Sequence, residues 1–153
     1  MTAPSHARQR TTVAADGAGA LRAPLIWGVI WGVLQAASPL AFPWLDPVTV
    51  YALGLALIAA IYIGFAVADG RGTVIAVETC VAAGFVVVAA VGVTGSAWLL
   101  VGGLAGHGLK DLGQHRTGFV AGTRWWPPFC ATVDFVAAAL IAVTILAEVH
   151  LGW

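Results

Sequence analysis

From Ala23 onward the chain alternates long apolar stretches with very short polar breaks. Prolines, glycine-rich turns and charged residues divide the apolar part into stretches over residues 23–42, 48–68, 73–91, 96–112 and 128–149. Each is close to the ~20 residues with which an α-helix crosses ~30 Å of hydrocarbon, and each is too long for a barrel strand of ~10 residues. The pattern predicts an all-α polytopic membrane bundle of about five transmembrane helices, and we treat residues 23–153 as the transmembrane helical domain.

Residues 1–22 differ from the rest because they are polar, rich in Ala, Thr and Arg, and without a helical or strand period. We expect this segment to be a disordered cytoplasmic tail. The apolar stretch after it is either a retained helix or a cleaved signal peptide. Gln35-Ala36-Ala37 matches a cleavage site poorly, and the apolar run is longer than a typical signal core, so we favour the retained helix.

Composition supports the membrane interpretation. The 153 residues are 60% hydrophobic and 9% charged, and the mean hydropathy is +0.93. Soluble domains carry about 25% charged residues, so this chain has too few to cover a water-facing surface. The formal net charge is zero, which gives no general attraction for polyanions. These values exclude an ordinary cytosolic enzyme and a nucleic-acid binder.

Charge also predicts an orientation in the cell (plasma) membrane. With the N-terminus in the cytoplasm and five spans, every Lys and Arg falls on the inner side and the C-terminus lies outside. The residues concerned are Arg8, Arg10, Arg22, Arg71, Lys110, Arg116 and Arg124. Tryptophans then lie near both interfaces, as an aromatic belt requires. Trp44, Trp98 and Trp153 belong to the outer interface, and Trp27, Trp125 and Trp126 to the inner one.

Small residues recur every four positions in three of the stretches. The series are Gly28, Gly32 and Ala36; Ala56, Ala60, Gly64 and Ala68; and Gly102 and Gly106. Small-xxx-small stripes allow helix backbones to approach closely in a membrane. The spacing is explained either by packing within the chain or by a homo-oligomer interface, and the sequence does not separate the two.

Ionisable residues within three apolar stretches provide the candidate chemistry. Glu78, His107 and Asp134 lie ~7–9 Å from the predicted cytoplasmic ends at 1.5 Å per residue, and Tyr62 lies at a similar depth. Charged groups at such depth are costly and are functional hypotheses by default. We take Glu78, His107 and Asp134 as candidate catalytic residues. The alternative is a polar network that only fixes helix register.

The run around His107 extends this cluster. Asp111 and His115 follow at i+4 and i+8, so the three share one helix face. We interpret Lys110, Asp111, His115 and Arg116 mainly as side chains that reach toward the interface. Because it shares the face of His107, Asp111 is also kept as a candidate substrate contact, as are Tyr62, Trp125 and Trp126. Cys80 and Cys130 form no CxxC motif, and we expect free thiols.

Several functions fit these residues. A protonated buried carboxyl group can act as a general acid, with the second acid or His107 as the base, which suits protonation, cyclisation or isomerisation of an isoprenoid-like lipid. A proton-linked small transporter and a non-catalytic membrane subunit are the alternatives. No HxxxH, HExxH or CxxC spacing is present, so we expect neither a metal nor another cofactor. Expected partners are membrane lipids, a lipophilic substrate and a second copy of the chain, without nucleic acid.

Two resemblances complete the sequence picture. The run Gly106-His107-Gly108-Leu109-Lys110-Asp111, followed by His115-Arg116, Arg124-Trp125-Trp126-Pro127-Pro128 and Asp134, resembles a family of small uncharacterised bacterial and fungal integral membrane proteins. This resemblance covers the second to fifth stretches and implies a membrane bundle without an assigned activity. The paired intramembrane acids are also similar, in residue type and not in motif, to the integral membrane terpene cyclases, which usually have more spans.

Overall fold

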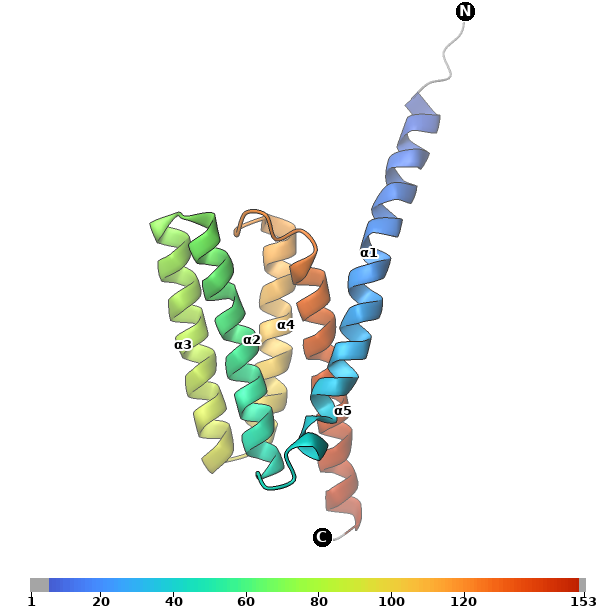
Figure 1. Ribbon diagram of the computed structural model, residues 1–153. Coiled ribbons are helices and arrows are strands. Elements are labelled where there is room, and N and C mark those ends of the chain that lie inside the picture. Colours follow the sequence, from blue (N-terminus) through green and yellow to red (C-terminus); the bar gives the residue numbers. More distant parts are fainter. Residues whose placement is uncertain (1–5, 152–153) are drawn as a thin grey trace, which may run out of the picture.

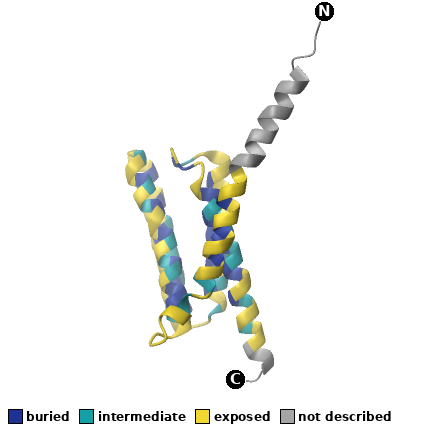
Figure 2. Cartoon of the chain, turned by 45° about the vertical axis from the view of Figure 1, so that its right-hand side comes forward, coloured by how far each residue is buried: buried dark blue, intermediate teal, exposed yellow. Residues whose placement is uncertain are grey.

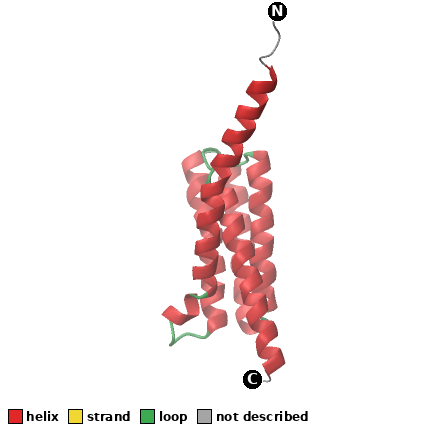
Figure 3. Ribbon diagram, turned by 90° about the vertical axis from the view of Figure 1, so that its right-hand side faces the viewer, coloured by secondary structure: helices red, strands yellow, loops and turns green. Residues whose placement is uncertain are grey.

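Over the residues that the structure describes, the protein is an all-α bundle of five long helices. The computed structural model describes the backbone of residues 6–151 and the burial of residues 21–147. The elements are α1 (His6–Ala36), a short 3₁₀ helix η1 (Ser38–Ala41), α2 (Pro47–Asp69), α3 (Gly72–Thr94), α4 (Trp98–Thr117) and α5 (Trp126–Leu151) (Figure 1). Within the described residues there is no strand (Figure 3). The predicted all-α fold class is therefore confirmed.

The helices run up and down in chain order. α2 packs on α3, α3 on α4, and α4 on α5, while α1 lies along the outer side of α5 (Figure 1). Short connections place the α2–α3 turn and the α4–α5 loop at one end of the bundle, the upper end in Figure 1. The η1 segment and the α3–α4 turn lie at the other end. This arrangement brings the middle parts of α2, α3, α4 and α5 around one interior.

Local signals explain where α2 and α4 end. Asp46 caps α2 by accepting a 2.9 Å hydrogen bond from the backbone N–H of Val48, and Pro47 occupies the first turn, where its missing N–H costs nothing. α2 ends at Gly70 (φ +80°) and α4 ends at Gly118 (φ +60°). Both glycines adopt the left-handed conformation that terminates many helices.

The small-residue stripe of α1 is used within the chain. A Cβ atom added at Gly28 would lie 2.6 Å from Cβ of Thr132, and one added at Gly32 would lie 2.7 Å from Cβ of Val136. α1 and α5 therefore approach as closely as the spacing predicts. The α2 stripe differs, because an added Cβ at Gly64 meets nothing within 4 Å. That stripe lies on an outer face of the bundle.

The outer surface of the bundle is apolar. Large hydrophobic side chains such as Leu57, Val87 and Val143 are exposed, while most of the described acidic residues of the helices are buried. Figure 2 shows exposed positions along the outer sides of the helices. By length and composition, the segments Pro47–Asp69, Gly72–Thr94 and Trp126–Ala147 are each able to cross a membrane. An apolar exterior around a polar interior is the arrangement that a lipid environment favours.

The largest differences between the predicted and observed boundaries concern α1, while α3 ends at Thr94 and α4 at Thr117, three and five residues later than predicted. The first apolar stretch is predicted to be helical to residue 42, but α1 ends at Ala36. The backbone carbonyl of Ala36 accepts a 3.0 Å hydrogen bond from Tyr51 Oη, and η1 follows with Pro39 in its first turn. At the other end α1 extends back to His6, into the segment predicted to be disordered, and residues 1–5 lie outside the described residues. Alanine, arginine and glutamine in this segment have high helix propensity, which the absence of an apolar period conceals.

Candidate functional site

A group of polar side chains is buried between α2, α3, α4 and α5. It lies between an apolar layer containing Leu55, Leu100 and Leu104 on one side and a smaller apolar group around Ala66 and Val74 on the other. Its buried members are Tyr62, Glu78, His107, Asp111, Gln114, Cys130 and Asp134. We call these residues, together with Lys110, the polar centre. Every helix of the four contributes at least one of them, so the centre exists only in the folded bundle.

His107 and two aspartates form the deepest part of the polar centre. His107 Nδ1 lies 2.8 Å from Asp134 Oδ2 on α5 and 3.5 Å from Asp111 Oδ2 one turn later on α4. Because both neighbours are carboxyl groups, a proton on Nδ1 is donated to Asp134. The rings of Phe85 and Tyr62 enclose the imidazole, with centroids 4.9 and 5.7 Å away.

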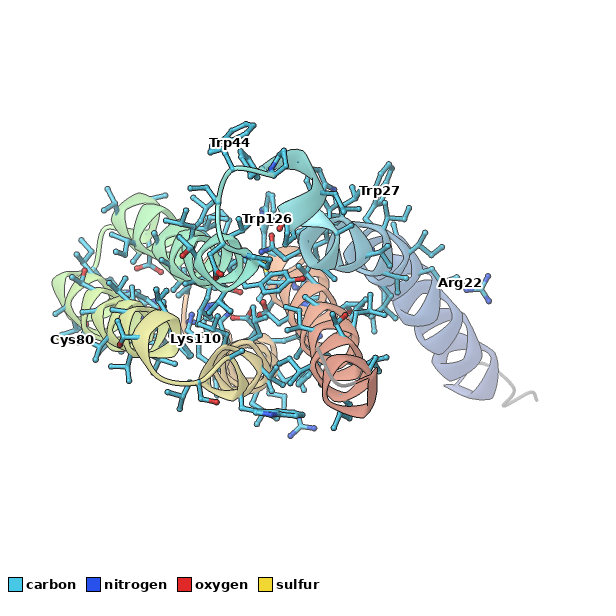
Figure 4. The ribbon with its side chains drawn as sticks, turned by 90° about the horizontal axis from the view of Figure 1, so that it is seen from below. Arg22, Trp27, Trp44, Cys80, Lys110 and Trp126 are labelled. Atoms are coloured by element: carbon cyan, nitrogen blue, oxygen red, sulfur yellow. The ribbon has the colours of Figure 1, made fainter. Side chains whose placement is uncertain are left out.

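Lys110 joins this part to α3. Its ammonium nitrogen lies 2.9 Å from Glu78 Oε2, 3.8 Å from Asp111 Oδ1 and 3.3 Å from the centroid of the Tyr62 ring. The amide of Gln114 donates a hydrogen bond to Glu78 Oε1. Viewed along the helices, Lys110 lies on the inner side of the bundle (Figure 4). One lysine thus contacts groups from three helices by charge and by a cation–π interaction.

The polar centre contains more acids than bases. Glu78, Asp111 and Asp134 face one ammonium group, that of Lys110, and one imidazole, that of His107. Within the described residues, Asp134 Oδ1 is buried without a hydrogen-bond partner. Buried charges that are not balanced are very costly in a medium of low polarity. The site is therefore suited to holding one or more protons, or a cation, among its carboxyl groups.

A polar cavity of about 470 Å³ lies at the end of the bundle next to the polar centre. It is lined by the last turn of α4, the loop after it and Pro127, and the lining residues include Gln114, Arg116 and Arg124. Since Gln114 also bonds to Glu78, this residue connects the cavity with the buried acids.

The loop beside this cavity is fastened to the α2–α3 turn. Asp69 Oδ2 accepts a 2.7 Å hydrogen bond from the backbone N–H of Ala121, and Arg71 Nη2 donates a 2.6 Å bond to the carbonyl of Phe119. Asp69 and Arg71 also form an ion pair with an Nε–Oδ1 distance of 2.6 Å. The Asp69 hydrogen bonds and charge raise the pKa of the Arg71 guanidinium, which stays protonated.

A second cavity, of about 410 Å³, lies between α1 and the start of α5. Five aromatic residues line it: Trp27, Trp31, Trp125, Trp126 and Phe129. We call it the aromatic cavity. From it a series of ring contacts leads to the polar centre, with centroid distances of 5.3 Å for Trp126–Phe65, 5.6 Å for Phe65–Tyr62 and 5.7 Å for Tyr62–His107.

The structure groups most of the residues selected from sequence. Glu78, His107 and Asp134, which were the candidate catalytic residues, lie together with Tyr62 and Asp111. The other two candidate substrate contacts, Trp125 and Trp126, lie in the aromatic cavity instead.

One interpretation was wrong. Asp111 is fully buried and Lys110 is only 17% exposed, so neither extends to the interface, whereas His115 and Arg116 are exposed as expected. On α4 the side chains of His107, Asp111 and Gln114 are buried, whereas His115, four residues after Asp111, is exposed.

Sequence reasoning missed Gln114, Phe85 and the central place of Lys110. Gln114 follows His107 by seven residues and Asp111 by three, which is the spacing of one helix face, so periodicity carried a usable signal. Phe85 gave none, because a phenylalanine in an apolar stretch of α3 does not indicate which helix it faces. The position of Lys110 depends on α3 supplying Glu78, which only the packing of α3 against α4 reveals.

The remaining chemistry concerns metals and thiols. Donor atoms of His107, Asp111 and Asp134 lie within 4.8 Å of one another, a spacing that a metal ion would accept. The Lys110 ammonium group already lies 3.8 Å from Asp111 Oδ1, and His107 already bonds to Asp134, so we interpret the three as a buried polar group rather than a ligand set. Both cysteines are free, Cys130 buried and Cys80 exposed, as expected; Figure 4 shows Cys80 at the outer side of α3.

Comparison of the chain with protein-family models, with curated proteins and with solved structures finds no match. Function is therefore argued from the polar centre and the two cavities beside it.

Proposed function

We propose that this chain is a multi-pass protein of the cell membrane and that its polar centre is the proton-exchange site of a small proton-linked transporter. The observation that carries the proposal is the surplus of buried carboxyl groups. Three acids face one lysine and one histidine, so neutrality of the site requires at least one added proton. Chains of Asp, Glu and His within membrane helices are a recurrent means of moving protons.

A route for that proton begins at the polar cavity. Glu78, which accepts a hydrogen bond from the cavity residue Gln114, is the first group that can take up a proton. Glu78 pairs with Lys110, and Lys110 lies 3.8 Å from Asp111. Asp111 and Asp134 both flank Nδ1 of His107. Beyond His107 the interior is the apolar layer with Leu55, Leu104 and Ile141. The site thus communicates with one side of the bundle, as an alternating-access protein does in one of its two states.

The distribution of basic residues supports the predicted orientation. Arg71, Arg116 and Arg124 belong to the end with the polar cavity. The η1 segment, the loop after it and the α3–α4 turn contain no Lys or Arg. By the positive-inside rule the polar cavity faces the cytoplasm. Protons then enter and leave the centre on the cytoplasmic side in the state described.

The test uses proton flux across reconstituted vesicles. A small-molecule extract of cells is trapped inside proteoliposomes with a pH-sensitive dye, and an inward proton gradient is applied. The wild type should acidify the lumen faster with the extract than without it, and Asp134→Asn should abolish that difference. Asp46→Asn is the matched control, because asparagine also caps a helix and Asp46 lies outside the polar centre. Equal extract-dependent flux in Asp134→Asn and the wild type would overturn the proposal.

A second candidate is acid–base catalysis on a lipophilic, isoprenoid-like substrate. The aromatic cavity favours it, since 410 Å³ of apolar space lies three ring contacts from His107. In this function Glu78 or Asp134 would be the acid and His107 the base, and cyclisation or isomerisation would follow protonation. Catalysis predicts a changed lipid product that disappears in Glu78→Gln, without any extract-dependent proton flux.

A further inference from the structure

The aromatic cavity has the composition of a binding site for a particular chemical class. Two tryptophans come from successive turns of α1, at positions 27 and 31, while Trp125 directly precedes α5 and Trp126 begins it. Trp125 stacks on Phe129 with 4.9 Å between ring centroids and an angle of 22°, while Trp126 meets both rings edge-on. Its volume lies within the ~300–1,000 Å³ that small-molecule sites occupy.

No charged side chain lines the aromatic cavity, but its walls are not electrostatically neutral. The face of an aromatic ring carries negative potential, and indole has the strongest attraction for cations. A small, strongly hydrated cation would lose too much hydration free energy on entering the cavity. A cation whose charge is spread out and covered by apolar groups loses little hydration free energy. Trp27 and Trp31 are about half exposed on the membrane-facing side of α1, so the site is open to a ligand that partitions into the bilayer.

The same cavity is linked to the polar centre through Phe65. Trp126 lies against Phe65, and Phe65 against Tyr62, whose ring carries the Lys110 ammonium on its face at 3.3 Å. Figure 4 shows Trp126 on the side of the bundle where α1 and α2 come near each other. A ligand that displaces Trp126 therefore acts on Tyr62, and through Tyr62 on the ammonium that balances Glu78 and Asp111.

We propose that the aromatic cavity binds a lipophilic organic cation, of the aryl-phosphonium or quaternary ammonium type, and that such a cation is the substrate exchanged for protons. The second half of this inference rests on the proposed function, while the binding site stands on its own geometry. Binding places positive charge three ring contacts from a centre that holds protons, and through Trp126, Phe65 and Tyr62 the two kinds of cation oppose each other. That opposition is what an exchange of substrate for protons requires.

The test compares two ions of nearly the same shape and opposite charge. Binding of radiolabelled tetraphenylphosphonium to the purified full-length protein in mild detergent is measured by equilibrium dialysis, with tetraphenylborate in parallel. Trp31→Leu and Trp125→Leu, which keep apolar volume and remove the indole face, should each weaken phosphonium binding about tenfold. Trp31→Phe should retain part of the affinity. Trp44→Leu and Trp98→Leu are matched controls, because neither residue lines the cavity, and they should bind as the wild type does.

The outcomes separate the two proposals. Equal protein-specific binding of the phosphonium and the borate, or unchanged binding in both cavity variants, would overturn the cation site. Release of protons from the protein on phosphonium binding is the second readout. If phosphonium binds to the wild type as expected but no protons are released, the cation site stands and its coupling to the proposed proton exchange is overturned. Proton release that is lost in Asp134→Asn, with phosphonium still bound, supports both. Extract-dependent proton flux without phosphonium binding leaves the proposed function in place and overturns this inference alone.

Discussion

His107 on α4 and Asp134 on α5 are joined by a 2.8 Å contact between Nδ1 and Oδ2, although neither side chain is more than 1% exposed. This contact fixes the two helices at one relative height. The rings of Phe85 and Tyr62 pack against the same imidazole, with centroids 4.9 and 5.7 Å away. The contact therefore links two helices and also holds the imidazole that would exchange a proton.

Removing the acceptor tests the structural part. Asp134→Ala leaves the Nδ1–H of His107 buried without its partner, and we expect a loss of about 3 kcal/mol in the free energy of unfolding in mixed micelles, from the cost of breaking a buried pair. Asp134→Asn keeps an oxygen acceptor and should lose about 1 kcal/mol. Asp46→Asn should match the wild type. Stability of Asp134→Ala equal to the wild type would mean that the contact does not hold α4 to α5.

The Lys110–Glu78 pair makes a separate prediction. Lys110→Met leaves the Glu78 and Asp111 carboxyl groups without the ammonium, and Glu78→Gln leaves the ammonium with Asp111 alone. The losses in the free energy of unfolding of the two single variants should add up to more than the loss of the double variant, because each single variant leaves an uncompensated charge buried. A double-mutant cycle in mixed micelles should give a coupling free energy of about 1–3 kcal/mol. Purely additive losses would show that the 2.9 Å ion pair is not maintained in solution.

The helices were predictable from sequence because hydrophobic stretches of bilayer length are separated by strong stop signals such as Asp69-Gly70 and the glycines of the segment Gly92–Gly95. The common depth of Glu78, His107 and Asp134 was predictable for the same reason, since depth follows from distance along a helix whose end is known. Both depend on counting residues along one helix at a time.

What could not be predicted depends on contacts between helices. Lys110 was assigned to the interface because nothing in the pattern of α4 shows that Glu78 of α3 faces it at 2.9 Å. Trp125 and Trp126 were assigned to the substrate site of the acids, but the cavity they line is completed by Trp27 and Trp31 of α1. That cavity follows from the packing of α1 on α5, which a stripe of small residues permits without specifying the partner.

The close approach of α1 to α5 gives a matched pair of variants. Gly28→Ala places a methyl group 2.6 Å from Thr132 Cβ and 2.8 Å from the carbonyl oxygen of Phe129, and overpacking of this kind costs about 1–3 kcal/mol. Gly64→Ala meets nothing within 4 Å and should gain about 0.5–1 kcal/mol from helix propensity. Unfolding in mixed micelles measures both. Equal stability changes would contradict the packing of α1 on α5.

Cysteine labelling tests how the bundle crosses the membrane. Ser96 is exposed in the α3–α4 turn, which carries no basic residue, and Ala121 is exposed in the loop beside Arg124 at the opposite end. The positive-inside rule places Ser96 outside the cell and Ala121 in the cytoplasm.

A membrane-impermeant maleimide added to intact cells should therefore label Ser96→Cys and leave Ala121→Cys unlabelled until the cells are permeabilised. The unaltered chain provides the background, because Cys130 is buried and Cys80 lies ~12 Å along α3 from its first residue, within the apolar part of the helix. Labelling of Ala121→Cys alone would reverse the orientation and place the polar cavity outside the cell. Labelling of both variants in intact cells would mean that the two ends of the bundle lie on one side, and a transporter that connects two compartments would then be excluded.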